Sequence, residues 1–144
     1  HDGQILTGNY IEEQMLNYDI ILPNSSMSRH ANEYEHYCEK HMSKDLECCL
    51  EVVRERAPEY ETAFFFFFSS NLISLGNIMI TRKQILDDYC AWLFDILFEV
   101  EQRTDLSGYD DYQKRIYGFL SERLLRTWVI MQKYRVLEEN IKCI

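Results

Sequence analysis

A cationic side chain lies where the sequence otherwise predicts an apolar helix face. Residues 109–133 contain no proline and one glycine and are too apolar for a loop, so we predict a helix. At about 3.6 residues per turn, its apolar side chains fall on one broad arc, which is typical of a helix that faces a core. The arc contains Tyr112, Ile116, Leu120, Leu124, Trp128 and Met131. Arg123 and Gln113 fall within the same arc.

The guanidinium of Arg123 needs a polar or negative partner. It stays protonated in proteins, and burying it alone is unfavourable. Three arrangements are open at this point. The side chain reaches water at the rim of the helix face, pairs with a buried carboxylate, or binds an anionic ligand.

Shorter elements must position this helix. Thr7 is a suitable N-cap for a first helix and Ser43 for a later one, and Thr81 with Gln84 forms a capping box before a long apolar helix. In chain order we predict helix 8–17, strand 18–22, turn 24–29, helix 30–41, helix 44–57, helix 58–68, strand 72–80, helix 82–103, helix 109–133 and a short edge strand 134–137. The predicted fold class is α/β, helix-dominated, with a small and incomplete sheet.

Composition limits the classes of function. The 144 residues are 47% hydrophobic and 14% aromatic, which predicts one globular domain over 1–144. A formal net charge of −9 argues against nucleic acid and anionic membranes as main partners. No apolar run reaches the roughly 18–20 residues of a membrane span. The five cysteines include no C-x-x-C motif and predict reduced thiols in a cytoplasmic protein.

Four stretches together resemble one family. They are YDIILP at 18–23, HYCEKHMSKDLE at 36–47, NIMITRKQILDDYCAWLFDILFEVEQR at 77–103 and YDDYQKRIYGFLSERLLRTW at 109–128. Their residues, order and spacing resemble the domain of unknown function 4422 family, found in glycosyltransferases of bacterial capsular and exopolysaccharide biosynthesis. The resemblance implies a Rossmann-like fold and transfer of a sugar from a nucleotide-sugar donor to a polysaccharide acceptor.

The chain also departs from that family. Members of that family look like longer chains that carry a basic, aromatic "HYRRYF"-like segment, and this sequence has no such segment. It also has no Asp-x-Asp motif for a metal-bound sugar nucleotide. The sequence also lacks an initiator methionine. We therefore expect the carboxyl-terminal portion of a longer domain, with the nucleotide-sugar donor, with or without a divalent metal, bound mainly by the other portion.

The resemblance implies roles for one acidic and one basic residue of the last long helix, Glu122 and Arg123. Glu122 could be the carboxylate base that takes the acceptor hydroxyl proton. The favoured alternative is a surface ion pair with Arg126, four residues later. Arg115 lies on the same face and is a further candidate for substrate binding. Arg123 could bind the donor diphosphate through its planar fork or form a structural ion pair with an acid from another element.

Three further sites were weighed in the same way. Gln113 could bond a sugar hydroxyl or, more simply, a buried backbone carbonyl. Asn77 could line a sugar pocket, although the adjacent Gly76 is more typical of a strand bulge. His36 and His41, with Cys38 between them, have no second pair of ligands at metal-binding spacing, so no metal site is predicted.

Five consecutive phenylalanines at 64–68 favour an alternative function. Five adjacent positions more than circle a helix, so some rings must meet a second surface. The alternative is a non-catalytic helical interaction module that packs on a missing amino-terminal lobe or on a second copy. With either function we expect a cytoplasmic protein, at most peripheral to the inner membrane face through partners.

Overall fold

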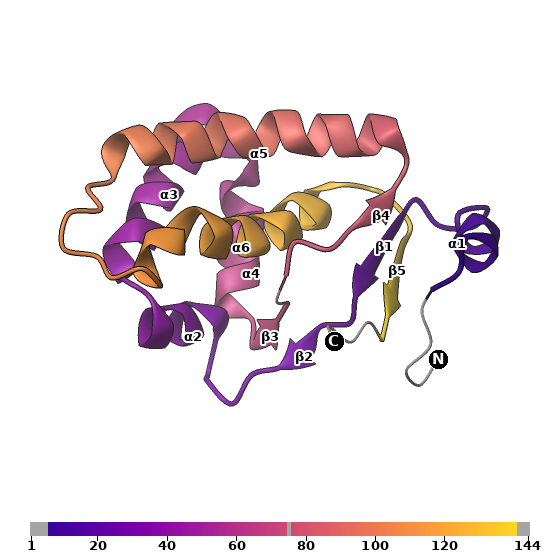
Figure 1. Cartoon of the computed structure of the whole chain (residues 1–144), viewed down its shortest axis with the longest axis horizontal. Coiled ribbons are helices and arrows are strands. Elements are labelled where there is room, and N and C mark those ends of the chain that lie inside the picture. Colours follow the sequence, from indigo (N-terminus) through magenta and orange to yellow (C-terminus); the bar gives the residue numbers. More distant parts are fainter. Residues whose placement is uncertain (1–5, 75, 141–144) are drawn as a thin grey trace.

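The computed structural model describes residues 6–74 and 76–140, in which a bundle of helices lies beside a small sheet (Figure 1). The helices are α1 (Gly8–Gln14), α2 (Glu33–Lys40), α3 (Ser43–Arg56), α4 (Glu61–Ser69), α5 (Lys83–Arg103) and α6 (Ile116–Met131), with 3-10 turns η1 (Pro58–Tyr60) and η2 (Gln113–Arg115). The strands are β1 (Ile20–Pro23), β2 (Ser26–Met27), β3 (Leu72–Ile73), β4 (Ile80–Thr81) and β5 (Val136–Glu139). The helix-dominated α/β prediction is confirmed. No described helix is both long and apolar enough to cross a membrane.

The central strand of the main sheet is β1. The strand order is β4-β1-β5, with β5 parallel to β1 and β4 antiparallel to it. Ile20, Ile21 and Leu22 have no exposed surface, as expected for a short apolar run buried on both faces. A second, two-stranded sheet joins β2 and β3. The predicted final strand is confirmed as an edge strand, displaced by two residues.

The predicted strand 72–80 is wrong as a single element. Its ends form β3 and β4, which belong to different sheets. Between them the chain turns at Gly76, whose φ of +95° is a conformation that a residue with a Cβ rarely adopts. The side chains of Ser74 and Asn77 form hydrogen bonds with residues of α6, and neither residue pairs in a strand ladder. Polar contacts to the neighbouring helix therefore replaced strand pairing here.

Helix caps were predicted with mixed success. The Thr7 hydroxyl accepts from the Tyr10 amide at 3.3 Å, which confirms that cap. The capping box is wrong, because Thr81 donates its hydroxyl to the Asp19 carbonyl at 2.7 Å and Arg82 is the N-cap of α5. Ser43 is the first residue of α3 and not its cap.

The predicted helix 109–133 is shorter than expected and more deeply buried. It begins as η2 and continues as α6, which lies at the centre of the helical layer (Figure 1). Between Phe119 and Trp128 every residue is buried except Glu122. Tyr112 and Met131, at the ends of the predicted arc, are 49% and 38% exposed. Helix α6 is therefore surrounded on nearly all sides in its middle turns.

Arg123 forms a buried ion pair with Glu33 of α2. The two residues are 2% and 1% exposed, and Arg123 Nε donates to Glu33 Oε1 at 2.9 Å. Arg123 Nη1 also donates to the Phe119 carbonyl and to Glu122 Oε2, both at 3.0 Å. Of the three arrangements, the structure has the pair with a carboxylate from another element. The other Glu33 oxygen lies 3.0 Å from His36 Nδ1.

A second buried arginine was not predicted. Arg126 is 8% exposed and contacts three separate segments. Its Nε donates to Ser74 Oγ at 2.7 Å, its Nη1 to Glu138 at 2.6 Å and its Nη2 to the Pro23 carbonyl at 2.7 Å. The predicted surface pair between Glu122 and Arg126 is therefore wrong, because the carboxyl ends of β1 and β5 provide better partners for a buried guanidinium.

A neutral histidine lies beside the Arg123 ion pair. The His41 ring stacks on Phe119 with centroids 3.9 Å apart and lies 4.8 Å from Tyr37. Burial, together with the positive charge of Arg123, lowers the pKa of His41 to about 4, and the neighbouring Gln113 side chain opposes the shift. Protonating His41 would place a second cation beside Arg123 in this buried cluster.

Glu33→Gln is expected to lower the free energy of unfolding by about 3–5 kcal/mol, because it leaves the Arg123 charge buried and uncompensated. Urea denaturation measures the change. Glu39→Gln, on the exposed part of the same helix, is the control and should change stability by no more than about 0.5 kcal/mol. Equal effects of the two substitutions would contradict the ion pair.

The free energy of unfolding is expected to fall as the pH drops from 6.5 to about 4. In this window the unfolded chain binds a proton at His41 that the folded chain excludes. Asp45 acts in the opposite direction near its own titration, because burial raises the pKa of its carboxyl group. His41→Phe should flatten the dependence in denaturation experiments across this window. A His41 pKa near the ordinary 6.5 by NMR would disprove the account.

Candidate functional site

Glu122 is the one carboxylate that the middle of α6 presents to solvent. Its side chain is 24% exposed, whereas its neighbours from Phe119 to Trp128 are buried. One turn earlier, a Cβ placed on Gly118 would meet no atom within 4 Å. Positions four apart lie on the same helix face. Gly118 and Glu122 therefore form an open polar window beside the middle turns of α6, where the other residues from Phe119 to Trp128 are buried.

The Glu122 carboxylate accepts a hydrogen bond from a buried arginine that is itself paired with a buried glutamate. Arg123 Nη1 donates to Glu122 Oε2 at 3.0 Å, and Glu33 fixes the same guanidinium through Nε at 2.9 Å. The Arg123 guanidinium carbon also lies 5.3 Å from the Tyr37 ring centroid. An oriented, partly exposed carboxylate of this kind can accept a proton from a bound hydroxyl group.

Arg115 and Gln113 lie near the amino end of α6, around the same aromatic residues. The Arg115 guanidinium carbon is 5.5 Å from the Phe119 ring centroid, and the arginine is exposed. Gln113 Nε2 donates to the Lys40 carbonyl at 2.8 Å, the backbone bond that the sequence favoured. Its side chain also lies near His41 and acts to raise the pKa of that histidine. Gln113 thus links the end of α2 to the start of α6.

Asn77 reaches α6 from the irregular segment after Gly76. Its Nδ2 donates to Ser121 Oγ at 2.6 Å, and that hydroxyl donates to the Gly118 carbonyl at 2.8 Å. Asn77 itself is exposed. The amide is therefore fixed at the residue that precedes Glu122, on the edge of the polar window.

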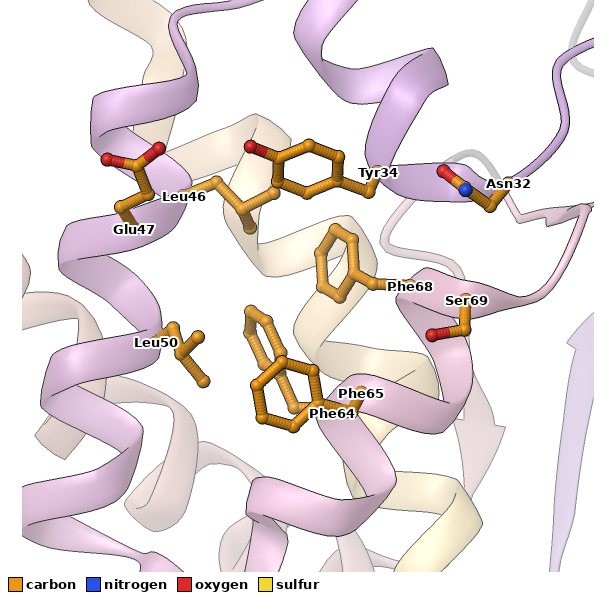
Figure 2. A pocket seen from close by; sticks show the side chains of 9 residues that line it. All are labelled: Asn32, Tyr34, Leu46, Glu47, Leu50, Phe64, Phe65, Phe68 and Ser69. Carbon is orange, nitrogen blue, oxygen red and sulfur yellow. The ribbon is translucent and has the colours of Figure 1, made fainter.

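The five predicted site residues are only partly brought together. Glu122 and Arg123 are in direct contact. Arg115 contacts the Phe119 ring and Gln113 lies near His41, and both Phe119 and His41 are also neighbours of Arg123. Asn77 joins the group only through Ser121. None of the five lines the pocket in Figure 2, which lies between α2, α3 and α4.

The burial of three polar residues was missed. Glu33, His41 and Arg126 were not predicted to lie inside the protein. One signal was present for α2, because Glu33, Tyr37 and His41 are spaced by four and share one face. No signal of that kind marked Arg126, whose partners are a backbone carbonyl and residues far away in sequence.

The described residues offer no metal centre. In residues 6–74 and 76–140, no three His, Cys, Asp or Glu side chains are grouped so that they could hold a metal ion. His36 instead lies against Glu33, and the His41 ring stacks on Phe119 and contacts the tilted ring of Tyr37. Both histidines therefore have structural surroundings.

Comparisons with known proteins identify the family of the chain. No curated protein matches the chain. The apo structure of WbbM, a bifunctional glycosyltransferase, is similar with a TM-score of 0.83 and 28% sequence identity, over 90% of this chain and 24% of that chain. This chain thus spans about a quarter of that protein. Residues 1–133 match the family model "Domain of unknown function (DUF4422)". The chain belongs to the DUF4422 family, as the sequence motifs predicted.

Proposed function

We propose that this chain is part of a domain that transfers a sugar from a nucleotide-sugar donor to a polysaccharide acceptor. Family membership and the likeness to a bifunctional glycosyltransferase support this class of function. Because the chain spans 24% of the similar structure, we propose that residues 1–144 are the carboxyl-terminal portion of a longer domain. A role in bacterial capsule or exopolysaccharide synthesis, in the cytoplasm or at the inner membrane face, completes the proposal.

The observation that carries the proposal is the carboxylate of Glu122. It is the one partly exposed side chain between Phe119 and Trp128, and a buried guanidinium donates a hydrogen bond to it. In the proposed reaction, Glu122 takes the proton of the acceptor hydroxyl. The acceptor oxygen forms a bond to the anomeric carbon, and the bond from that carbon to the donor phosphate breaks. The nucleoside diphosphate leaves with the electron pair.

The other site residues have supporting roles in this proposal. Arg123 is a positioning residue, because its charge is already balanced by Glu33 and Glu122. Exposed Arg115 is the candidate residue for binding the donor diphosphate. Measuring the donor KM of Arg115→Lys tests this role, because a lysine cannot form the same planar fork. Asn77 is the candidate residue for a hydrogen bond to a sugar hydroxyl. Gln113 bonds the carboxyl end of α2 and has a structural role.

No metal-dependent step is assigned to this chain. The described side chains provide no group of three ligands, so they do not fit a divalent ion. In the proposal, donor binding, with a divalent metal where the full enzyme uses one, belongs mainly to the remainder of the longer domain.

Glu122→Gln is expected to lower kcat by about 10²–10⁴-fold, which is the usual contribution of a positioned base. The KM for acceptor should change little, because the amide keeps the shape of the side chain. Steady-state sugar transfer by the full protein measures both constants. The control is Glu101→Gln, an exposed acid on α5. A kcat within twofold of the parent protein would show that Glu122 is only a partner of Arg123.

The exposed phenylalanines favour an interaction surface as a second function. Phe64, Phe67 and Phe68 are at most 4% exposed, whereas Phe65 and Phe66 are 44% and 67% exposed. Two adjacent rings in solvent suit packing against another lobe or a second copy. Sedimentation at increasing concentration distinguishes the two kinds of contact. Concentration-dependent association supports a second copy, and a protein that stays monomeric supports a lobe of the same polypeptide.

A further inference from the structure

An aromatic pocket opens between α2, α3 and α4, away from Glu122 (Figure 2). Its volume is about 280 Å³. The lining residues are Asn32, Tyr34, Leu46, Glu47, Leu50, Phe64, Phe65, Phe68 and Ser69. Tyr34 lies on one side of the space, Phe64 and Phe65 lie on the other, and Phe68 lies between them (Figure 2). Aromatic rings therefore border the pocket on several sides.

The rings are held by packing, and the mouth of the pocket is open. Phe64 stacks on Phe68 with centroids 4.4 Å apart and meets Phe65 edge-on at 6.4 Å. Phe64 and Phe68 are 3% and 4% exposed, so they form the floor. Tyr34 and Phe65, at 43% and 44%, form the rim. A bound group would thus meet a fixed floor and two reachable ring faces.

The charged side chain among the residues that line this described pocket is negative. Glu47 is exposed at the rim, and Figure 2 shows its carboxylate on the same side as the Tyr34 hydroxyl. The pKa of Tyr34 is raised, first by a hydrogen bond with Cys38 and also by the charge of Glu47, so that carboxylate lies near the ring. Lysine and arginine are absent from the nine lining residues of this described pocket.

One ring of the pocket already carries a cation of the chain itself. The Arg54 guanidinium carbon lies 5.6 Å from the Phe65 ring centroid, and Arg54 Nε donates to Glu61 at 2.6 Å. Aromatic faces attract cations through the ring quadrupole, at distances up to about 6 Å. Phe65 therefore already makes one cation–π contact, with Arg54. A cationic ligand in the pocket could make a second contact of the same kind with this ring.

We propose that this pocket binds the alkylammonium group of a small molecule. The methyl groups of a quaternary ammonium would contact Phe64, Phe65 and Tyr34, and its positive charge would face Glu47. A neutral apolar group of the same shape would lose both electrostatic contributions, and an anion would be repelled by the carboxylate. The proposal concerns a surface separate from Glu122 and does not rest on the proposed sugar transfer.

An NMR titration with choline chloride, using the full protein, tests the proposal. The neutral isostere 3,3-dimethyl-1-butanol is the matched ligand control. Saturable shifts at the pocket residues with choline, at least about fivefold tighter than with the isostere, are expected from cation–π attraction of about 1 kcal/mol or more. Equal affinity of the two compounds, or no saturable shift with choline, would overturn the proposal.

Matched variants locate the binding. Phe65→Leu keeps an apolar side chain but removes the ring, and should weaken choline binding by about 2- to 30-fold. The control Phe98→Leu removes a ring that is 58% exposed on α5, outside the pocket, and should not change affinity. Equal losses in the two variants would overturn the proposal. Glu47→Gln, an exposed substitution compatible with the fold, should also weaken binding, and an unchanged affinity would contradict the role of the charge.

A third titration arm identifies the source of the cation. A short peptide that contains trimethyllysine carries the same group on a protein side chain. Affinity for choline equal to or greater than that for the peptide supports a small-molecule ligand. Peptide binding more than tenfold tighter than choline would overturn that assignment and indicate a protein partner.

Discussion

A single buried ion pair joins α2 to α6, the helix at the centre of the helical layer. The guanidinium of Arg123 and the carboxylate of Glu33 are almost wholly inaccessible to water, and each is satisfied by further bonds within the chain. Removing either charge alone would leave the other uncompensated in a medium of low polarity. The pair therefore specifies how α2 packs against the central helix more than it adds net stability.

The same pair connects packing to the candidate chemistry. Arg123 lies between Glu33, which is inaccessible, and Glu122, which reaches the surface. A side chain on α2 thereby controls the orientation of a carboxylate on α6. Neutral His41 completes the arrangement by avoiding a second positive charge in the cluster. Preorganisation of this kind is what a positioned base requires, because its geometry must be set before the acceptor arrives.

Much of the fold could be predicted from local sequence signals. Strand β1 and the long helix α5 have uninterrupted patterns, so their periodicity predicts them correctly. The segment 72–80 misled because its apolar composition is typical of a strand, whereas its Ser74 and Asn77 side chains bond α6. Contacts between residues distant in sequence decide such a case, and a local pattern does not contain them.

The candidate site was predictable to a similar degree. A charge within an apolar arc indicated that Arg123 needs a polar or negative partner, but the sequence left open whether that partner is water at the rim, a buried acid or a ligand. Glu33 is not distinguished from other helical glutamates by its neighbours. The pairing of Arg126 with Glu138 was equally hidden, because an i, i+4 pair with Glu122 was locally available. Burial decided between them, since a guanidinium enclosed by β1 and β5 cannot remain without partners there.

The most direct measurement is the sugar-transfer rate of a variant in which both members of the ion pair are replaced by apolar residues, Glu33→Leu with Arg123→Met. Such a replacement can keep the fold, which circular dichroism and urea denaturation would verify. If the pair orients Glu122, the folded variant will have a strongly reduced kcat with a donor KM close to that of the parent protein. A folded variant that retains the parent kcat would contradict the account.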